Sequence, residues 1–288
     1  MLKEASEIAK NTSEAIKNFH TVISNILQPK GIDLAIIEGH KRIIESSINR
    51  EDIDELTKVA FLSNYKKMVR EYENCSRIVE IALPSISTDS KPHDVEDDWF
   101  TFFFDKVRLI SDETVQQIWG KILANEVKTP GAFQRSLLHT LSVMSKSQAE
   151  FFCNISRFCM NEYKDEDAVH PLLFISSNVE SYENSRISPD GLLDLENLGL
   201  IQCDFKGEYI FRKKKVFRYG TKMIEVYGDP NNNDKIKAGN VTFTCNGNAL
   251  FHVVGSEFKE YRSDILDFTI TKLRKRNCKV IVNGQLVT

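Results

Sequence analysis

The sequence predicts an α+β protein, with a mainly α-helical amino-terminal body and a carboxyl-terminal α+β module of winged-helix character. Up to about residue 160, apolar side chains recur with the 3.6-residue period of helices, and from about Pro171 they alternate as in strands. The 288 residues are 41% apolar and 27% charged, which suits one large soluble domain or two of average size.

The first region, residues 1–83, is expected to hold three helices. In residues 4–27 apolar side chains follow alternating steps of three and four, as in a coiled-coil seam, so this helix should pack against another helix or a second copy. Further helices are predicted at about 34–49 and 52–82, and Pro84 stops the last of them. The seam residues expected to mediate oligomerisation are Ile8, Phe19, Val22 and Ile26.

Two further regions precede the point, at about Pro171, where the spacing of apolar residues changes from that of helices to that of strands. Segment 84–96 contains two prolines and no apolar period, which predicts a linker. Residues 97–165 are expected to form a helical core domain, whose first helix carries Trp99 and several phenylalanines. Ser111 with Asp112 and Glu113 predicts the capped, acidic start of a second helix, and the last helix of this domain is expected to extend to Cys159.

Residues 170–288 are expected to form the α+β module. Ser188-Pro189-Asp190 predicts a capped helix start, and a hairpin should follow it, with 200–203 and 209–211 as the two arms. A helix followed by a hairpin is the order of elements in winged-helix domains. The other predicted elements are strands at 172–175, within 217–227 and at 241–244, a final helix at about 258–276, and a strand at 279–282.

Charge is unevenly distributed along the chain. From Phe205 to the end there are 16 Lys and Arg against 8 Asp and Glu, although the whole chain carries a net charge of −3. A basic module of this kind indicates contact with nucleic acid, with an acidic partner, or with the acidic first part of the same chain. The residues expected to make the contact are Arg212, Lys213, Lys214, Lys215 and Arg218 after the hairpin, and Lys272, Arg274, Lys275 and Arg276 on the final helix.

The motifs of common enzyme classes are missing from the sequence. It contains no phosphate-binding glycine loop, no HExxH and no GxSxG. Pro189-Asp190 and Asp204-Phe205-Lys206 fit a loose pattern of metal-dependent nucleases, but helix capping already explains the first pair. We therefore expect no catalytic residue, no metal and no cofactor.

The sequence also predicts where the protein resides. No stretch approaches the roughly 18 apolar residues of a membrane span, so no membrane span is expected. The six cysteines include no CxxC pair, which fits a reducing compartment and favours a cytoplasmic location.

Several segments resemble a bacterial protein family known only as a domain of unknown function. They are Trp119-Gly-Lys-Ile-Leu-Ala-Asn-Glu126 with Pro130-Gly-Ala-Phe133, the preceding Asp98-Trp99 and Ser111-Asp-Glu113, the helix start at Ser145–Glu150, and Val241–Leu250. The resemblance spans most of the chain. The resemblance implies membership of this family but gives no catalytic residues to transfer to this chain. The occurrence of some members near phage genes implies a setting in phage defence.

Two functions remain as hypotheses. The first is a non-enzymatic interaction or assembly protein of bacterial or phage origin, which self-associates or binds a protein partner and uses its basic module as a contact surface. The alternative is a nucleic-acid-binding protein of winged-helix type, with metal-dependent nuclease activity as a variant of it.

Overall fold

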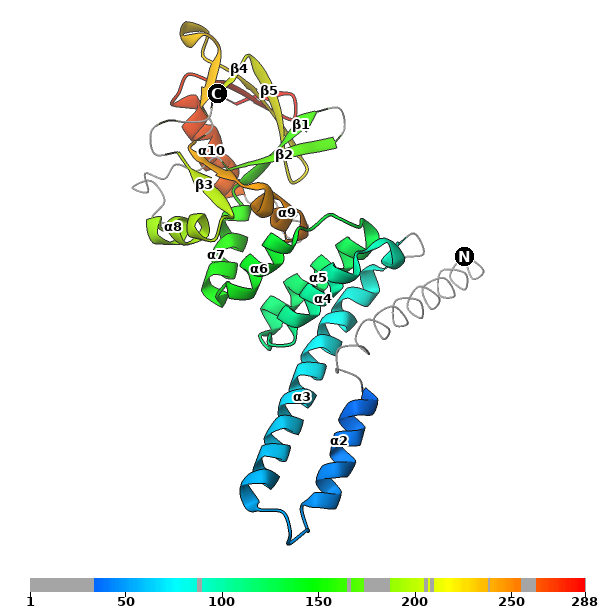
Figure 1. The fold of residues 1–288 in the computed structure, drawn as a ribbon. Helices are drawn as coiled ribbons and strands as arrows, with labels where there is room; N and C mark the ends of the chain where they lie inside the picture. The colour runs from blue at the N-terminus through cyan, green and yellow to red at the C-terminus, as the bar shows by residue number, and fades with distance from the viewer. Residues whose placement is uncertain are drawn as a thin grey trace. The chain divides into compact units, whose positions relative to one another are not determined.

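The computed structural model describes residues 34–86, 90–164, 167–173, 187–204, 207, 210–237, 239–254 and 263–287. The chain divides into two compact units, Met1–Ser142 and Val143–Thr288. Both helices and sheet are present, so the α+β class is confirmed (Figure 1). In the described ranges, no helix combines the length and apolar character needed to cross a membrane.

Unit 1 begins, in its described part, with a helical hairpin. Helix α2 (Leu34–Ser47) packs along α3 (Glu55–Ala82), so both predicted helices are confirmed (Figure 1). The carboxylate of Asp54 accepts a hydrogen bond from the Thr57 N–H and so caps the start of α3. Every buried residue of α3 lies at Glu71 or beyond, so only the second half of this helix is anchored in the core.

The core of unit 1 is built by three more helices. These are α4 (Asp97–Val107), α5 (Glu113–Lys128) and α6 (Arg135–Val143). On α4 the Trp99 and Phe103 rings stack with centroids 5.1 Å apart, and Phe103 meets the Trp119 ring of α5 edge to face at 5.3 Å. Asp112 caps α5 by accepting hydrogen bonds from Thr114 and Val115, as predicted.

Helices α3 and α5 approach each other closely at Gly120. A Cβ atom at this position would overlap the Ile81 side chain of α3. Only glycine lets the two backbones come this near, and α3 and α5 make the most extensive helix contact of the unit. In the Trp119-Gly120 pair of the motif, the tryptophan ring therefore lies in the core and the glycine permits the close contact between the two helices.

The segment expected to be a linker is packed in its described part. It contains two short 3₁₀ turns, η2 (Leu83–Ser85) and η3 (Pro92–Asp94). Ile86 and Val95 are buried, and the Lys91 N–H donates to the Val127 carbonyl at 2.7 Å. Residues 84–86 and 90–96 are thus part of unit 1, because their apolar side chains contribute to its core.

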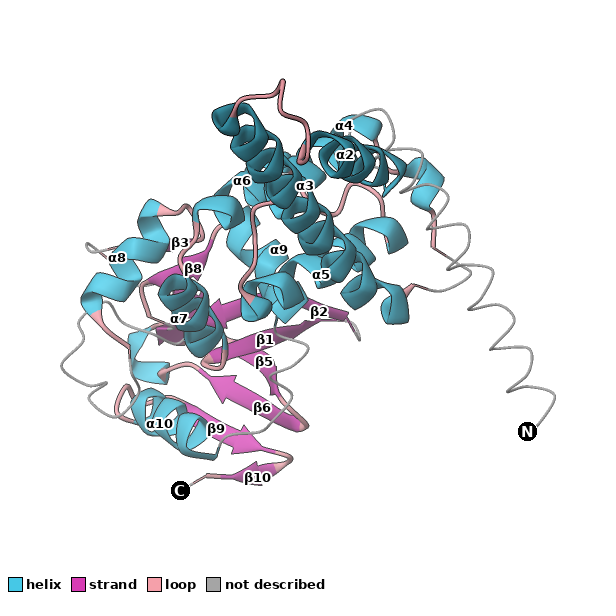
Figure 2. Cartoon of the chain, turned by 90° about the horizontal axis from the view of Figure 1, so that it is seen from below, coloured by secondary structure: helices cyan, strands magenta, loops and turns pink. Residues whose placement is uncertain are grey.

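Unit 2 contains an eight-stranded sheet with the order β10-β9-β6-β5-β1-β2-β8-β3, in which all neighbouring strands are antiparallel (Figure 2). Strands β4 and β7 form a separate two-stranded sheet. The strands are β1 (Cys159–Lys164), β2 (Asp167–Leu173), β3 (Ile201–Cys203), β4 (Ile210–Arg212), β5 (Lys214–Tyr219), β6 (Lys222–Tyr227), β7 (Lys235–Lys237), β8 (Val241–Phe243), β9 (Lys279–Val282) and β10 (Gln285–Leu286).

In the described part of unit 2, four helices accompany the sheet. Helix α7 (Lys146–Ser156) starts with a capping box made by Ser145 and Gln148, and α8 (Pro189–Asn197) is capped by Ser188 as the sequence predicted. Helix α9 (Cys245–Val254) contacts β2 and β8, and α10 (Ser263–Arg274) contacts β9.

The boundary between the units differs from the one expected at 165–170. Helix α7 belongs to unit 2, and β1 begins at Cys159, where a helix was expected. The Phe152 ring of α7 packs against Phe243 of β8 with centroids 5.5 Å apart. This contact ties α7 to the sheet, so the predicted helical domain 97–165 is divided between the two units.

The hairpin that was expected to form the wing is not found among the described residues. Strand β3 pairs with β8, and β4 pairs with β7 in the other sheet, so 200–203 and 209–211 do not form one hairpin. The Asp204 N–H donates to the Asn240 carbonyl, and the Asn240 side-chain amide donates back to the Asp204 carbonyl. These two bonds direct the chain after β3 toward β8, and the hairpin expectation was wrong.

Helix α9 was not predicted from the sequence. Its start is held by Thr244, whose hydroxyl donates to the Gly199 carbonyl at 2.6 Å and accepts from the Gly247 N–H. A Cβ atom at Gly247 would overlap the Leu200 carbonyl, so glycine is required where α9 passes the end of α8. Contacts with distant residues, and not helix propensity, decide this element.

Candidate functional site

Two basic segments far apart in the sequence meet in unit 2. Residues 210–219 and 268–287 each contain five Lys or Arg and no acidic residue. The Arg276 guanidinium donates to the Lys237 carbonyl of β7 at 2.8 Å, and β7 pairs with β4 so that Lys235 lies opposite Arg212. We call the resulting surface the basic corner; it comprises Arg212, Lys213, Lys235, Lys237, Arg274, Lys275 and Arg276.

A tight chain crossing fixes the position of Lys213. This residue has a positive φ of 70°, and it separates β4 from β5. Its N–H donates to the Asp234 carbonyl and its own carbonyl accepts from the Gly228 N–H. The crossing holds an exposed lysine at the junction of the two sheets, between Arg212 and Lys214.

The structure places only part of the predicted basic set in the corner. Lys214 instead forms an ion pair of 2.8 Å with Glu225 of β6, and this hydrogen bond raises the pKa of Lys214 and lowers the pKa of Glu225. The ammonium of Lys215 lies 5.4 Å from the Phe211 ring centroid. Lys272 similarly lies 6.0 Å from the ring centroid of Phe268 on its own helix.

The sequence did not predict two members of the corner, and Arg218 is a fourth predicted residue that lies outside it. Lys235 and Lys237 flank the buried Ile236 of β7, and the alternation Lys-Ile-Lys was the available signal for a strand. Arg218 is exposed on β5, opposite Met223 in the register of that sheet. The predicted seam residues Ile8, Phe19, Val22 and Ile26 lie outside the described residues.

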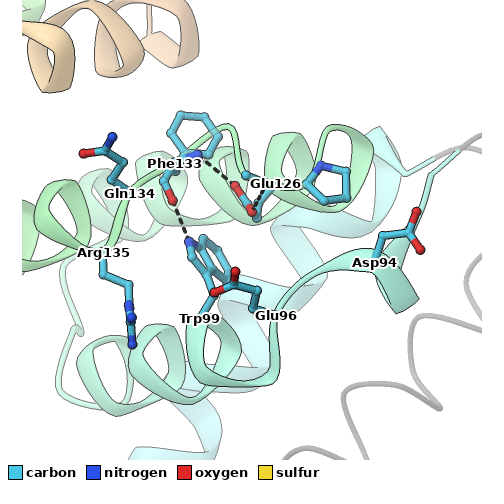
Figure 3. A pocket seen from close by; sticks show the side chains of 9 residues that line it. Asp94, Glu96, Trp99, Glu126, Phe133, Gln134 and Arg135 are labelled. Carbon is cyan, nitrogen blue, oxygen red and sulfur yellow. Dashed lines mark hydrogen bonds between the residues drawn. The ribbon is translucent and has the colours of Figure 1, made fainter.

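A second candidate is a pocket of about 430 Å³ in unit 1, beside the most specific motif (Figure 3). Its wall includes Trp99 and Phe133, the carboxylates of Glu96 and Glu126, and Arg135. Trp99 belongs to α4 and Glu126 to α5, so the two motif segments that lie apart in the sequence meet here.

The polar groups of this pocket hold the turn between α5 and α6. The two carboxylate oxygens of Glu126 accept hydrogen bonds from the Gly131 N–H at 2.6 Å and the Phe133 N–H at 2.9 Å. The Trp99 indole N–H donates to the Phe133 carbonyl at 2.8 Å, as the dashed lines in Figure 3 mark. Burial raises the pKa of Glu126, while these N–H donors oppose the shift. The motif side chains thus act as a structural clamp.

The nuclease pattern finds no metal site in the part of the chain that is described. Pro189 and Asp190 form the first turn of α8, where Ser188 caps the helix. The Asp204 carboxylate accepts a hydrogen bond from the Gly207 N–H. Within the described ranges, no three His, Cys, Asp or Glu side chains group closely enough to hold a metal ion.

A third candidate surface is the end of the α2–α3 hairpin. Ten large apolar side chains are exposed in the described residues, and five of them lie within residues 43–61. We call this set the apolar tip; it comprises Ile43, Ile48, Leu56, Val59 and Phe61. Figure 1 shows the connection between α2 and α3 at the end of the hairpin away from α4 and α5.

Comparisons with other proteins identify a family. Among curated proteins and among solved structures, none matches this chain significantly. The model of a family described as "Protein of unknown function (DUF2806)" matches residues 63–266. That range contains the Trp99 to Phe133 clamp and the Thr244 to Gly247 helix start, both of which carried the resemblance seen in the sequence. Because the match covers more than half of the chain, the protein belongs to this family.

Proposed function

We propose that the protein is a non-enzymatic interaction protein, and that two copies assemble through the apolar tip of the α2–α3 hairpin. The observation that carries the proposal is the concentration of exposed apolar side chains at this tip. Leu56 is 79% exposed, Val59 58% and Ile43 52%, although single exposed residues elsewhere are normal for a soluble protein.

Among the described residues of unit 1, none buries these side chains completely. Between Glu55 and Arg70, α3 contains no buried residue, and its apolar positions are half-buried or exposed. Full burial of one Leu, Ile, Val or Phe side chain contributes about 1.5–3 kcal/mol. Ten such side chains from two tips, each half covered already, would contribute on the order of 10 kcal/mol, which is comparable to the cost of association.

The charge of the hairpin favours a second copy as the partner. Residues 34–73 carry seven Lys or Arg and eight Asp or Glu, so two copies do not repel each other strongly. An interface related by a twofold axis places the same patch on both subunits, and an apolar patch of balanced charge meets this requirement. A setting in phage defence, which the resemblance suggested, stays a prediction.

The first test is the mass of the protein in solution. We expect light scattering to give twice the chain mass for the wild type at high concentration, and the chain mass for a Leu56→Ser/Val59→Ser variant. The matched control is Leu109→Ser/Leu193→Ser, which removes two leucines that are 64% and 53% exposed outside the tip. It should behave as the wild type, and circular dichroism should show that both variants are folded.

Two results would contradict the proposal. One is a wild type that stays monomeric over the whole concentration range. The other is a control variant that loses assembly to the same extent as the tip variant, since the exposed tip would then have no special role.

A further inference from the structure

We propose that the basic corner binds single-stranded nucleic acid through the sugar–phosphate backbone. The corner gathers seven Lys and Arg from β4 and the residue after it, from β7, and from the end of α10 and the turn that follows. Arg212, Lys213, Lys237, Arg274 and Lys275 are exposed. Asp234 is the acidic residue within these segments, between Lys213 and Lys235 in space. A surface with this excess of one sign suits a partner whose charge is uniformly negative.

A nucleic acid fits the corner better than an acidic protein. Protein surfaces carry both signs of charge, and their interfaces mix charged with apolar contacts. A nucleic acid strand presents one negative charge at every nucleotide, which lysine and arginine can neutralise without base-specific contacts. The corner offers several cations along two chain segments and so matches a polymer with regularly spaced phosphates.

Backbone hydrogen bonds hold the cations in place. Arg276 is tied to the Lys237 carbonyl, and Lys213 is held at the crossing between Asp234 and Gly228. Two carbonyls at the end of α10, which would repel a phosphate, are already engaged, since Leu273 accepts from Arg276 and Cys278, and Arg274 accepts from Asn277. These bonds reduce the negative character of the helix end beside the corner.

Two of the neighbouring carboxylates, Asp229 and Glu225, have other partners, whereas Asp234 is exposed. Asp229 is buried, and it accepts from the Asn231 N–H at 2.9 Å and lies 3.4 Å from the Asn277 amide nitrogen. Glu225 is paired with Lys214 and accepts from the Tyr227 hydroxyl. These contacts leave the exposed lysines and arginines as the dominant charges of the surface.

Aromatic rings at the border of the corner favour a single strand. Phe211 lies on β4 beside Arg212, and Tyr227 is flanked by the ammonium groups of Lys214 and Lys279 at 5.3 and 5.6 Å from its centroid. Both rings are half-buried. Lysines interleaved with rings form the combination that binds phosphates and stacks unpaired bases, whereas the bases of a duplex are already stacked on each other.

The proposal is tested by fluorescence anisotropy with a labelled oligothymidylate and the full-length protein. We expect binding at low salt, with an affinity that falls by about 0.7 log units per neutralised phosphate for each tenfold rise in salt. A duplex of the same length should bind more weakly at the same salt concentration. Unlabelled heparin should displace the oligonucleotide, because the contacts are made with the backbone charge.

Charge reversal locates the site. The variant Lys213→Glu/Lys275→Glu should weaken binding by at least about tenfold. The slope of log affinity against log salt concentration should fall by the amount expected for about two lost phosphate contacts. The matched control, Lys66→Glu/Lys128→Glu, makes the same change in net charge at two exposed lysines of unit 1, and it should keep the affinity within about twofold. Thermal unfolding should show that both variants are folded.

Each remaining outcome overturns the proposal. The proposal is wrong if oligothymidylate does not bind at low salt. It is also wrong if the two charge-reversal variants lose affinity equally. Tighter binding of the duplex would contradict the role given to the rings. The tip variant Leu56→Ser/Val59→Ser should still bind the single strand, so failure of the assembly proposal leaves this test intact.

Discussion

Glu126 and Trp99 show how single side chains hold the chain in unit 1. Glu126 is 2% exposed, yet both carboxylate oxygens have backbone N–H donors, and the Trp99 indole fixes the carbonyl of Phe133. A buried carboxylate without such donors would be far more costly. Glu126 and Trp99 therefore have a structural role in the turn between α5 and α6.

We predict that Glu126→Gln destabilises the protein by about 1–3 kcal/mol, because one side-chain amide oxygen replaces two acceptors and one backbone N–H stays unpaired. The pKa of Glu126 is raised by burial, so the unfolded chain releases this proton first as pH rises from about 4.5. The free energy of unfolding of the wild type should therefore fall as pH rises from about 4.5 to the raised pKa of the folded state. The Gln side chain does not titrate, so the variant should show no such fall from this site.

Urea unfolding at a series of pH values measures both effects. The difference in unfolding free energy between wild type and Glu126→Gln should shrink as pH rises above the unfolded pKa. A difference that grows with pH would mean that the ionised carboxylate is favoured in the fold, against the direction that burial gives.

At the scale of elements, helices were more predictable than strands. The caps at Asp112, Ser145 and Ser188 depend on residues adjacent in sequence, and for α7 the structure selects Ser145 over Ser147, the other start that the pattern allowed. The partners of β3 and β4 depend on residues such as Asn240, which lies 36 positions from Asp204, and no local pattern encodes such a pairing. The short polar strand Cys159–Lys164 likewise gains its structure from pairing with β2 and β5.

The contact of α3 with α5 gives a prediction at this scale. Gly120→Ala should lower the unfolding free energy by about 1–3 kcal/mol, because the added methyl group must displace the Ile81 side chain or separate the helices. Shortening the neighbour with Ile81→Ala should restore part of this loss. A double-mutant cycle measured by urea unfolding should therefore give a favourable coupling above about 0.5 kcal/mol. Additive effects would show that the two residues do not meet.

For the whole molecule, the sequence predicted the charge of the surfaces better than their geometry. The excess of Lys and Arg after Phe205 pointed to a basic contact surface, and the structure brings five of the nine named residues together at the basic corner. The hairpin that was expected to carry part of them is not formed in the described residues, because β3 pairs with β8 and β4 pairs with β7. The apolar tip was not predicted, since the same residues also fit a helix packed along its whole length; their exposure depends on where α3 meets its neighbours.

Assembly through the apolar tip is tested most directly by hydrogen–deuterium exchange of the wild type at low and high protein concentration. Peptides that cover residues 43–61 should exchange more slowly at high concentration, because the second copy excludes water from the tip, while peptides from α4 should not change. The Leu56→Ser/Val59→Ser variant should show no concentration dependence. Equal exchange of residues 43–61 at both concentrations, or protection confined to another part of the chain, would contradict assembly through this surface.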